Sequence, residues 1–344
     1  MTRKTLATAV VALGVATAVL RCQAQPTTFF KDRIHLPDAE IQKIQQGKVV
    51  TKVLESGDAK YGMLVFGAVY VNAPVDRFAA VVKDFPALLQ NKVYLGVQEF
   101  SAIGAPPKPA DFAAITLEKK DVDQLQTCKP GDCDIQIINV EDLQKRVDWK
   151  SPNRYEQVNQ IVREKIYQGM VTYQKDGLKG LGSYRDRRQP MSLYHATKGM
   201  IDLSYYLPKD KAEGIYNHVT EYPQRKMAGA EDRFYWEKID FGQEPTIRVN
   251  HVSMFPQGAG AAKFVAVNKQ LYASRYMRVA VQMFYCVPDT ERPGSGFYLI
   301  EMNDSRLPDF GGIKLGIVRK VATGKAVDAT RDALQMYQKT LNRK

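Results

Sequence analysis

IRVNHVSMF (residues 247–255), KFVAVNKQLYAS (263–274), MRVAVQMFYCV (277–287) and FYLIEMNDS (297–305) are four strand-like runs that follow one another closely in the chain. They are rich in β-branched and aromatic residues, which favour strands. One long helix is then expected from Ile313 to about Asn342. Strands in hairpin succession followed by a terminal helix predict an antiparallel sheet with a helix across one face. Such a layout can enclose an apolar cavity, so it favours binding over catalysis.

Strand-like runs also occur earlier in the chain. Val49–Leu54 and Tyr61–Val71 read as two strands around a Gly-Asp turn, and Val93–Phe100 as a third. Between them we expect a helix that is capped by Asn72 and has Pro74 in its first turn. These elements therefore add strands and one short helix to the C-terminal sheet.

The middle of the chain, about residues 103–228, has a different texture. Its longest predicted helix spans about Asn153–Lys175, and Val158, Val162, Ile166 and Met170 recur there at intervals of four residues. Strand character resumes only at Arg233–Phe241. The middle stretch is therefore predicted to be a mainly helical insertion.

The N-terminus has the pattern of a bacterial secretory signal. Two basic residues precede an apolar run at Leu6–Leu20, and Cys22-Gln23-Ala24 places small residues where a signal peptidase cuts. We expect residues 1–24 to be removed and residues 25–344 to be exported, to the periplasm. The run is shorter than the roughly 20 residues of a spanning helix, which disfavours an uncleaved anchor. Lipidation of Cys22 is disfavoured by the bulky Arg21.

The cysteines fit an exported protein. Cys128 and Cys133 flank a Pro-Gly turn that can bring their sulfur atoms together. A disulfide is the favoured interpretation in an oxidising compartment. A metal site is the alternative, but two thiols without a histidine at ligand spacing make a poor ligand set. We predict no metal or other cofactor, and we expect Cys286, inside an apolar strand, to be a buried thiol.

The chain is basic, with a formal net charge of +12. The predicted signal contains basic residues and no acidic one, so the mature protein stays strongly basic. A basic exported protein can contact an anionic membrane surface, although ordinary solubility explains the charge equally well. No nucleic-acid motif is present, and we expect no nucleic acid as a partner.

Residues 65–78 read VFGAVYVNAPVDRF. This segment is similar to the strand of the START-like superfamily that runs into an Ala-Pro motif and the first helix, and Asp84 lies near a frequent aspartate of that family. The antiparallel run from Phe234 to Ser305 and the terminal helix extend the similarity to about 150 residues. On these segments the chain resembles the START-like or helix-grip superfamily, also called Bet v 1-like, polyketide cyclase-like or SRPBCC.

The resemblance implies an α+β fold in which a curved antiparallel sheet grips a long C-terminal helix. The core would comprise about residues 49–102 and 229–344, and the helical insertion about 103–228. It further implies a cavity for a hydrophobic small molecule such as a lipid, a sterol or a polyketide. It does not imply one chemistry, because the superfamily contains carriers, cyclases and oxygenase subunits.

Candidate ligand-binding residues are polar residues of the strands and small residues of the terminal helix. They are His251, Tyr272, Arg275, Tyr298, Asn303, Ala326, Ala329 and Ala333. A few polar anchors in a mostly apolar cavity are the usual composition of a ligand site. Alternation along a strand does not reveal which face of the sheet is concave, so solvent-facing positions for these polar residues are also open.

The terminal helix has two contrasting faces. Alanines recur at helical spacing on one side, where small side chains allow either close packing on the sheet or space for a ligand. The rest of the helix is basic, with eight Lys and Arg residues against two Asp over residues 313–344. This basic face is explained either by solvation or by attraction to an anionic membrane.

Signatures of catalysis are weak. The four histidines are far apart in sequence, and neither a Gly-x-Ser-x-Gly elbow nor a phosphate-binding loop is present. We therefore expect an exported protein that binds a hydrophobic, lipid-like molecule between sheet and helix, with a carrier role, and we predict no catalytic residue. Two alternatives stay open. One is a cyclase- or hydrolase-type enzyme, for example with His251 beside a carboxylate, and the other is an envelope interaction module with a filled core.

Overall fold

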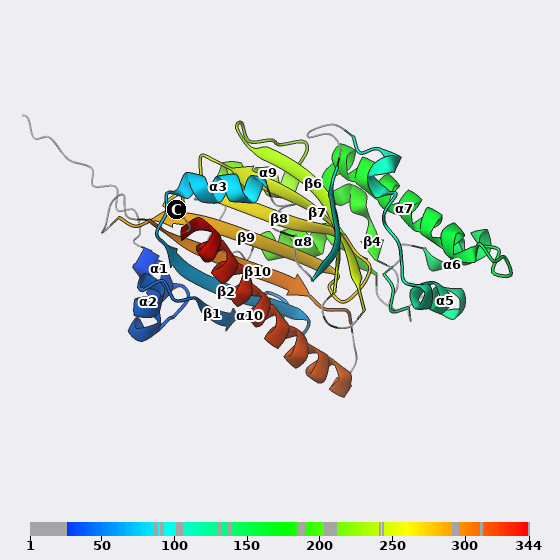
Figure 1. Ribbon diagram of the computed structural model, residues 1–344, viewed down its shortest axis with the longest axis horizontal. Helices are drawn as coiled ribbons and strands as arrows, with labels where there is room; N and C mark the ends of the chain where they lie inside the picture. Colours follow the sequence, from blue (N-terminus) through cyan, green and yellow to red (C-terminus); the bar gives the residue numbers. More distant parts are fainter. Residues whose placement is uncertain are drawn as a thin grey trace, which may run out of the picture.

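The structure is a computed structural model, and it describes residues 26–342 except 85–88, 90–92, 101–105, 130–132, 137–138, 185–189, 203–211, 241, 243, 291–295 and 310–311, with only the backbone at 312–314. Its centre is one eight-stranded antiparallel sheet (Figure 1). The strands are β1 (Val50–Leu54), β2 (Gly62–Val71), β3 (Tyr94–Glu99), β6 (Glu231–Ile239), β7 (Thr246–Phe255), β8 (Phe264–Ala273), β9 (Val279–Pro288) and β10 (Phe297–Arg306). Their order in the sheet is β1-β2-β10-β9-β8-β7-β6-β3.

The strand order places a strand from the N-terminal part of the chain beside the last strand. The last strand, β10, pairs with β2 along its whole length, from Phe297 opposite Val71 to Arg306 opposite Gly62. β1 and β3 are the edge strands, β3 pairs with β6, and α3 (Val75–Lys83) connects β2 to β3 in the chain. The α+β fold predicted from the sequence is therefore confirmed.

The C-terminal helix α10 (Gly312–Asn342) lies across one face of the sheet, called here the inner face, over β1 and β2 (Figure 1). The amide of Gln338 donates to the backbone oxygens of Gly47 and Tyr70, at 2.8 Å each. Near the C-terminal end of α10 the ring of Tyr337 meets Phe78 and Phe284, with centroids 5.3 and 5.6 Å apart. Aromatic rings therefore fill the space under this end of the helix.

The opposite, outer face is covered by the N-terminal helices and by the insertion. The helices there are α1 (Pro26–Asp32), α2 (Asp38–Gln45), α7 (Arg154–Asp176), α8 (Leu193–Asp202) and α9 (Glu213–Glu221). Shorter elements connect them: η1 (Pro109–Phe112), α5 (Lys119–Thr127), α6 (Val140–Arg146), η2 (Gly177–Leu181), β4 (Ser183–Tyr184) and β5 (Met191–Ser192). Because both faces are covered, every residue of β2 is buried, and its sequence is almost continuously apolar.

One local prediction is wrong. Helix α3 begins at Val75 with Pro74 as its N-cap, and Asn72 does not cap it. Pro74 has an extended conformation, with φ −68° and ψ 148°, so the helix starts only after the proline. No side chain accepts a hydrogen bond from the first turn.

The cysteine predictions are confirmed. Cys128 and Cys133 form a disulfide, with Cα atoms 5.2 Å apart. Cys286 is free and buried, and burial raises the pKa of its thiol well above the usual value. Among the described residues, no group of three or more His, Cys, Asp or Glu side chains could hold a metal ion. The predicted signal peptide lies outside the described residues, and none of the helices within them is long and apolar enough to cross a membrane.

The close approach of α10 to β2 depends on Gly67. A Cβ atom at this position would lie 2.5 Å from Cγ2 of Thr330 and 2.6 Å from Cδ1 of Leu334. We predict that Gly67→Ala lowers the free energy of unfolding by about 1–3 kcal/mol, because the added methyl group overpacks this contact. The measurement is urea unfolding followed by circular dichroism.

The matched control is Gly324→Ala in the same helix. A Cβ there meets no atom within 4 Å, so the change should be neutral or stabilise by up to about 1 kcal/mol through helix propensity. Equal stability of Gly67→Ala and wild type would contradict the tight helix–sheet contact.

Candidate ligand-binding site

A row of polar side chains crosses the inner face of the sheet, from β6 to β10. We call it the polar band, and it consists of Glu237, Arg248, Asn250, Asn268, Gln282, Glu301 and Asn303. The sheet register aligns its members: Glu237 lies opposite Arg248, and Gln282 lies between Asn268 and Asn303. Elsewhere on the inner face, the side chains of the strands are mainly apolar and aromatic. The polar band is therefore the hydrophilic part of an otherwise hydrophobic surface.

Hydrogen bonds join the polar band into two groups. Oε1 of Glu237 accepts from Nε of Arg248 at 2.8 Å and from Nδ2 of Asn250 at 2.9 Å. At the other end, Nε2 of Gln282 donates to Oε1 of Glu301 at 2.8 Å. These bonds satisfy the charge on Glu237, but they leave the carboxyl group of Glu301 with one partner for its two oxygen atoms.

Unpartnered polar atoms lie where the sheet meets α10. Oε2 of Glu301 on β10 and Oγ1 of Thr330 on α10 are both buried and have no hydrogen-bond partner. Glu301 pairs with Gly67 in the sheet register, and Thr330 contacts the same glycine from the helix side. A donor or acceptor that is buried without a partner costs about 1–3 kcal/mol. The pair is thus a place where a polar group of a ligand, or a water molecule, would be stabilised.

Burial controls the ionisation of Glu301. Desolvation raises its pKa to about 7, against the opposing effect of the hydrogen bond from Gln282. Burial also raises the pKa of Tyr337 on α10, and the charge of Glu301 adds to this effect. Near neutral pH the carboxyl group can therefore carry a proton, and then it donates as well as accepts a hydrogen bond.

The residues predicted from the sequence do not form one site. Asn303 lies in the polar band, and Ala326 is buried on the sheet side of α10, whereas Ala333 is half-buried and Ala329 is exposed. The other four belong to the outer side or to the insertion. Tyr298 packs against the rings of Phe30 and Tyr70, Arg275 pairs with Asp121, Tyr272 lines an outer pocket and His251 is sealed in the outer core.

Sequence reasoning missed Glu301, Gln282, Glu237 and Thr330. A signal for Glu301 does exist, because Phe297, Leu299, Glu301 and Asn303 alternate along β10 and so share one face. A carboxylate in such an alternating series indicates a polar position on a buried surface. The strand alone does not show which of its two faces meets α10, and this is why the position was not singled out.

His251 is the centre of a buried cluster on the outer face. Its Nδ1 bonds to the hydroxyl of Tyr173 at 2.7 Å, and its Nε2 to Oδ1 of Asp232 at 2.8 Å. The same carboxylate oxygen accepts from Ser253 at 2.9 Å and bonds to Nε2 of His218 at 2.9 Å. Burial lowers the pKa of His251 to about 3.

This cluster has a structural role. His251 is 0% exposed, and neutral histidine with the proton on Nε2 satisfies both partners at once. Lys269 is buried beside it, where its ammonium group donates to the backbone oxygen of Val219 at 2.8 Å and burial lowers its pKa to about 7. A histidine–carboxylate pair thus exists, but its histidine is fully buried and its aspartate is only 12% exposed.

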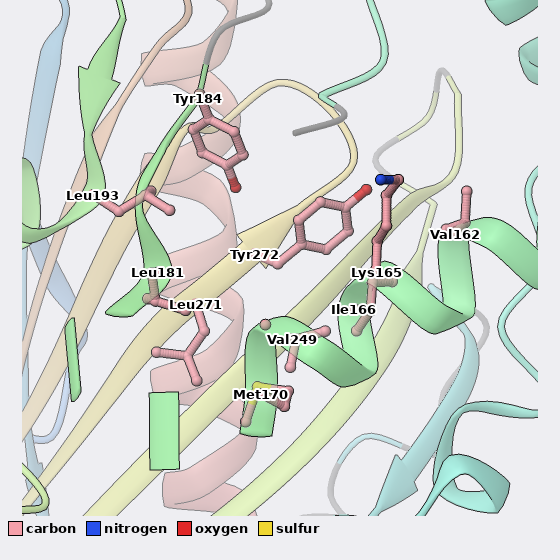
Figure 2. Close-up of a pocket in the computed structure, with 11 residues that line it drawn as sticks. Val162, Lys165, Ile166, Met170, Leu181, Tyr184, Leu193, Val249, Leu271 and Tyr272 are labelled. Carbon is pink, nitrogen blue, oxygen red and sulfur yellow. The ribbon is translucent and has the colours of Figure 1, made fainter. Parts of the chain in front are cut away.

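A pocket opens on the outer face between α7 and strands β7 and β8 (Figure 2). Its lining is mainly aliphatic, with Lys165, Tyr184 and Tyr272 as its polar members, and its empty volume is about 570 Å³ including the part open to solvent. The sheet separates this pocket from α10. Its walls come from the insertion and from the sheet, so it differs from the site predicted between sheet and terminal helix.

Comparison with known proteins adds little to the geometry. No family model matches the chain, and no curated protein matches it. Among solved structures it is similar to a START superfamily protein from Mycobacterium smegmatis, with 10% sequence identity and a TM-score of 0.21, over 33% of this chain and 69% of that one. Such a score supports no inference about function. The antiparallel sheet with its C-terminal helix is consistent with a helix-grip fold on its own geometry.

The raised pKa of Glu301 predicts a pH-dependent stability. The native state keeps the proton up to about pH 7, whereas the unfolded chain loses it above about pH 4.5. As the pH rises from 4.5 to 7, ionisation of this carboxyl group lowers the free energy of the unfolded state but not that of the native state. The native state therefore becomes relatively less stable. We predict that Glu301→Gln matches wild type at pH 4 and is more stable by roughly 1–3 kcal/mol at pH 8.

The measurement is urea unfolding of both proteins at pH 4, 6 and 8. Burial also raises the pKa of Asp304 to about 7, but Asp304 is present in both proteins, so its contribution cancels in the difference. A stability difference that stays constant from pH 4 to pH 8 would show that Glu301 ionises normally.

Proposed function

We propose that this chain is an exported protein that binds a hydrophobic, lipid-like small molecule between the inner face of the sheet and α10, and carries it through the bacterial envelope. The observation that carries the proposal is a pair of buried atoms without hydrogen-bond partners, Oε2 of Glu301 on β10 and Oγ1 of Thr330 on α10. They lie on opposite sides of the helix–sheet contact, at the β10 end of the polar band, on a face that is elsewhere mainly apolar and aromatic. A mostly apolar site with a few convergent polar groups is typical of small-molecule binding.

The two atoms define the polar end of the proposed ligand. A protonated Glu301 offers a donor, and Thr330 offers a donor and an acceptor. A hydroxyl or carboxyl group would satisfy both. The hydrocarbon part of the ligand would contribute roughly 0.8 kcal/mol for each buried methylene group, so useful affinity requires no further special contact.

Lys325 is a basic residue on α10. It reaches the turn between β6 and β7, where a Cβ on Gly242 would lie 3.5 Å from its ammonium nitrogen. The basic side of α10 therefore extends from β1 and β2 toward the far strands. We include attraction to an anionic membrane surface in the proposal, because a basic helix beside the ligand would favour transfer of a lipid from such a surface.

Two other functions have a specific observation in their favour. The His251–Asp232 pair favours a cyclase- or hydrolase-type enzyme, but the complete burial of His251 argues against it. The aromatic packing around Phe78 and Tyr337 favours an interaction module with a filled core. This packing fills one end of the inner face, whereas the unpartnered polar atoms lie at Gly67, farther along α10.

Export predicts a defined mature N-terminus. We predict that protein expressed from the full-length gene in a bacterium is recovered from the periplasmic fraction with an intact mass that lacks residues 1–24, because the apolar run and the small residues before Gln25 direct cleavage there. Intact-mass spectrometry of the purified protein checks this. A full-length mass in the membrane fraction would support the uncleaved anchor instead.

Ligand binding predicts a co-purifying hydrophobic molecule. We predict that native mass spectrometry and lipid extraction of protein from its own compartment detect such a molecule, and that a fluorescent lipid binds saturably. Thr330→Val should weaken binding of the extracted molecule by about tenfold, because it removes one hydrogen-bonding group of the proposed site while keeping its shape.

The matched control is Thr323→Val, which makes the same change on α10 at a half-buried position outside the Gly67 contact. It should bind as wild type does. The absence of any co-purifying ligand together with no saturable lipid uptake would overturn the proposed function, and would leave the filled-core interaction module as the explanation.

A further inference from the structure

The outer pocket has one polar end and one apolar end. Figure 2 shows the ammonium group of Lys165 and the hydroxyl of Tyr272 together at one end, and Met170, Val249 and Leu271 at the other. None of the lining residues is acidic, and Lys165 is the one that carries a charge at neutral pH. This distribution is complementary to an amphiphile with an anionic head group.

A glycine in α7 keeps the pocket open. Gly169 lies in the middle of a 23-residue helix, where glycine costs about 1 kcal/mol relative to alanine. A Cβ on Gly169 would meet no atom within 4 Å, so close packing does not require the glycine. It lines the pocket, and any larger side chain there would project into the empty space. The glycine in α7 therefore leaves this part of the pocket unfilled.

Lys165 can bind a further anion. Its ammonium group pairs with Asp142 at 2.8 Å, and Asp142 also has Arg146 at 3.7 Å. The carboxylate of Asp142 is 41% exposed and would keep Arg146 and water as partners if Lys165 turned toward a ligand. The pair is only partly buried, with side-chain exposures of 24% and 41%, so its contribution to stability is small. The lysine is thus available at the mouth of the pocket at small cost.

The hydroxyl of Tyr272 at the polar end of the pocket already donates its proton within the protein. The hydroxyl of Tyr272 donates to the backbone oxygen of Gln136 at 3.0 Å. The side-chain amide of Gln136 is buried, at 1% exposure, and neither of its polar atoms has a hydrogen-bond partner. An unpartnered buried amide is a costly arrangement, and the backbone of the same residue holds the Tyr272 hydroxyl at the polar end of the pocket.

We propose that the outer pocket binds an unbranched alkyl carboxylate, with its carboxylate at Lys165 and its chain against Met170, Val249 and Leu271. The carboxylate matches the lysine charge and accepts hydrogen bonds without needing a donor. The mainly aliphatic lining between α7 and the strands offers apolar contacts to a flexible chain. The site goes beyond the proposed function, because the sheet separates it from α10 and the insertion supplies most of its wall.

The test uses octanoate as the probe, in isothermal titration calorimetry with the mature protein, and compares it with 1-octanol and octylamine. We expect saturable binding of octanoate, with at least tenfold weaker binding of both comparators. Lys165→Met, which keeps the apolar stem, should weaken octanoate binding at least tenfold and leave 1-octanol binding unchanged. Equal affinities of wild type for octanoate and 1-octanol would overturn the assignment of the head group.

Gly169→Phe locates the site. The phenyl ring should fill the pocket and abolish octanoate binding without loss of stability, because its Cβ meets open space. Gly199→Phe on α8 is the matched control, since a Cβ there also meets no atom within 4 Å, and it should bind octanoate normally. Undiminished binding by Gly169→Phe, or no octanoate binding by wild type, would overturn the proposal.

The two binding proposals fail independently. Thr330→Val should not change octanoate binding, and Gly169→Phe should still co-purify with the molecule held under α10. Loss of octanoate binding in Thr330→Val would place the carboxylate on the inner face and overturn the outer site.

Discussion

The pairing of β2 with β10 is the constraint on which the rest of the structure depends. Ten consecutive residue pairs join a strand from the start of the chain to the last strand. Because α10 follows β10 directly, this pairing places the helix over β2, where Gly67 allows close contact with Thr330 and Leu334. The contact in turn places Thr330 over Gly67, which lies opposite Glu301 in the sheet. One long-range pairing of strands thus positions the helix, the tight contact and the candidate site.

Two groups of buried polar side chains, one on each face of the sheet, differ in how their hydrogen bonds are satisfied. On the outer face, Asp232 is shared by His218, His251 and Ser253, and these contacts satisfy the cluster internally. On the inner face, Glu301 and Thr330 keep atoms without partners. A satisfied cluster stabilises a core, whereas unpartnered atoms leave a cost that a ligand can remove. This difference distinguishes the structural cluster from the candidate site, although histidine beside aspartate is the more suggestive combination chemically.

The insertion changes what the sheet can do. Without its helices, the outer face of β6, β7 and β8 would lack the cover provided by α7. With them, Phe234 and Trp236 become core residues, and Gly169 leaves a pocket between helix and strands. One sheet therefore has a candidate site on each face. The helix over one site follows the last strand, and the helix over the other comes from the middle of the chain.

The sequence alone determined the elements and the fold class, because the strands from Thr246 to Arg306 and the helix that follows are long, strongly patterned segments. It also determined the disulfide, since Cys128 and Cys133 are close in the chain. Only the tertiary structure decided which residues face one another. β2 joins β10 across more than 200 residues, and both faces of the sheet are buried, so hydrophobic alternation does not separate inner from outer positions. The sequence therefore did not show that His251 and Tyr298 lie on the outer face, or that Glu301 lies under α10.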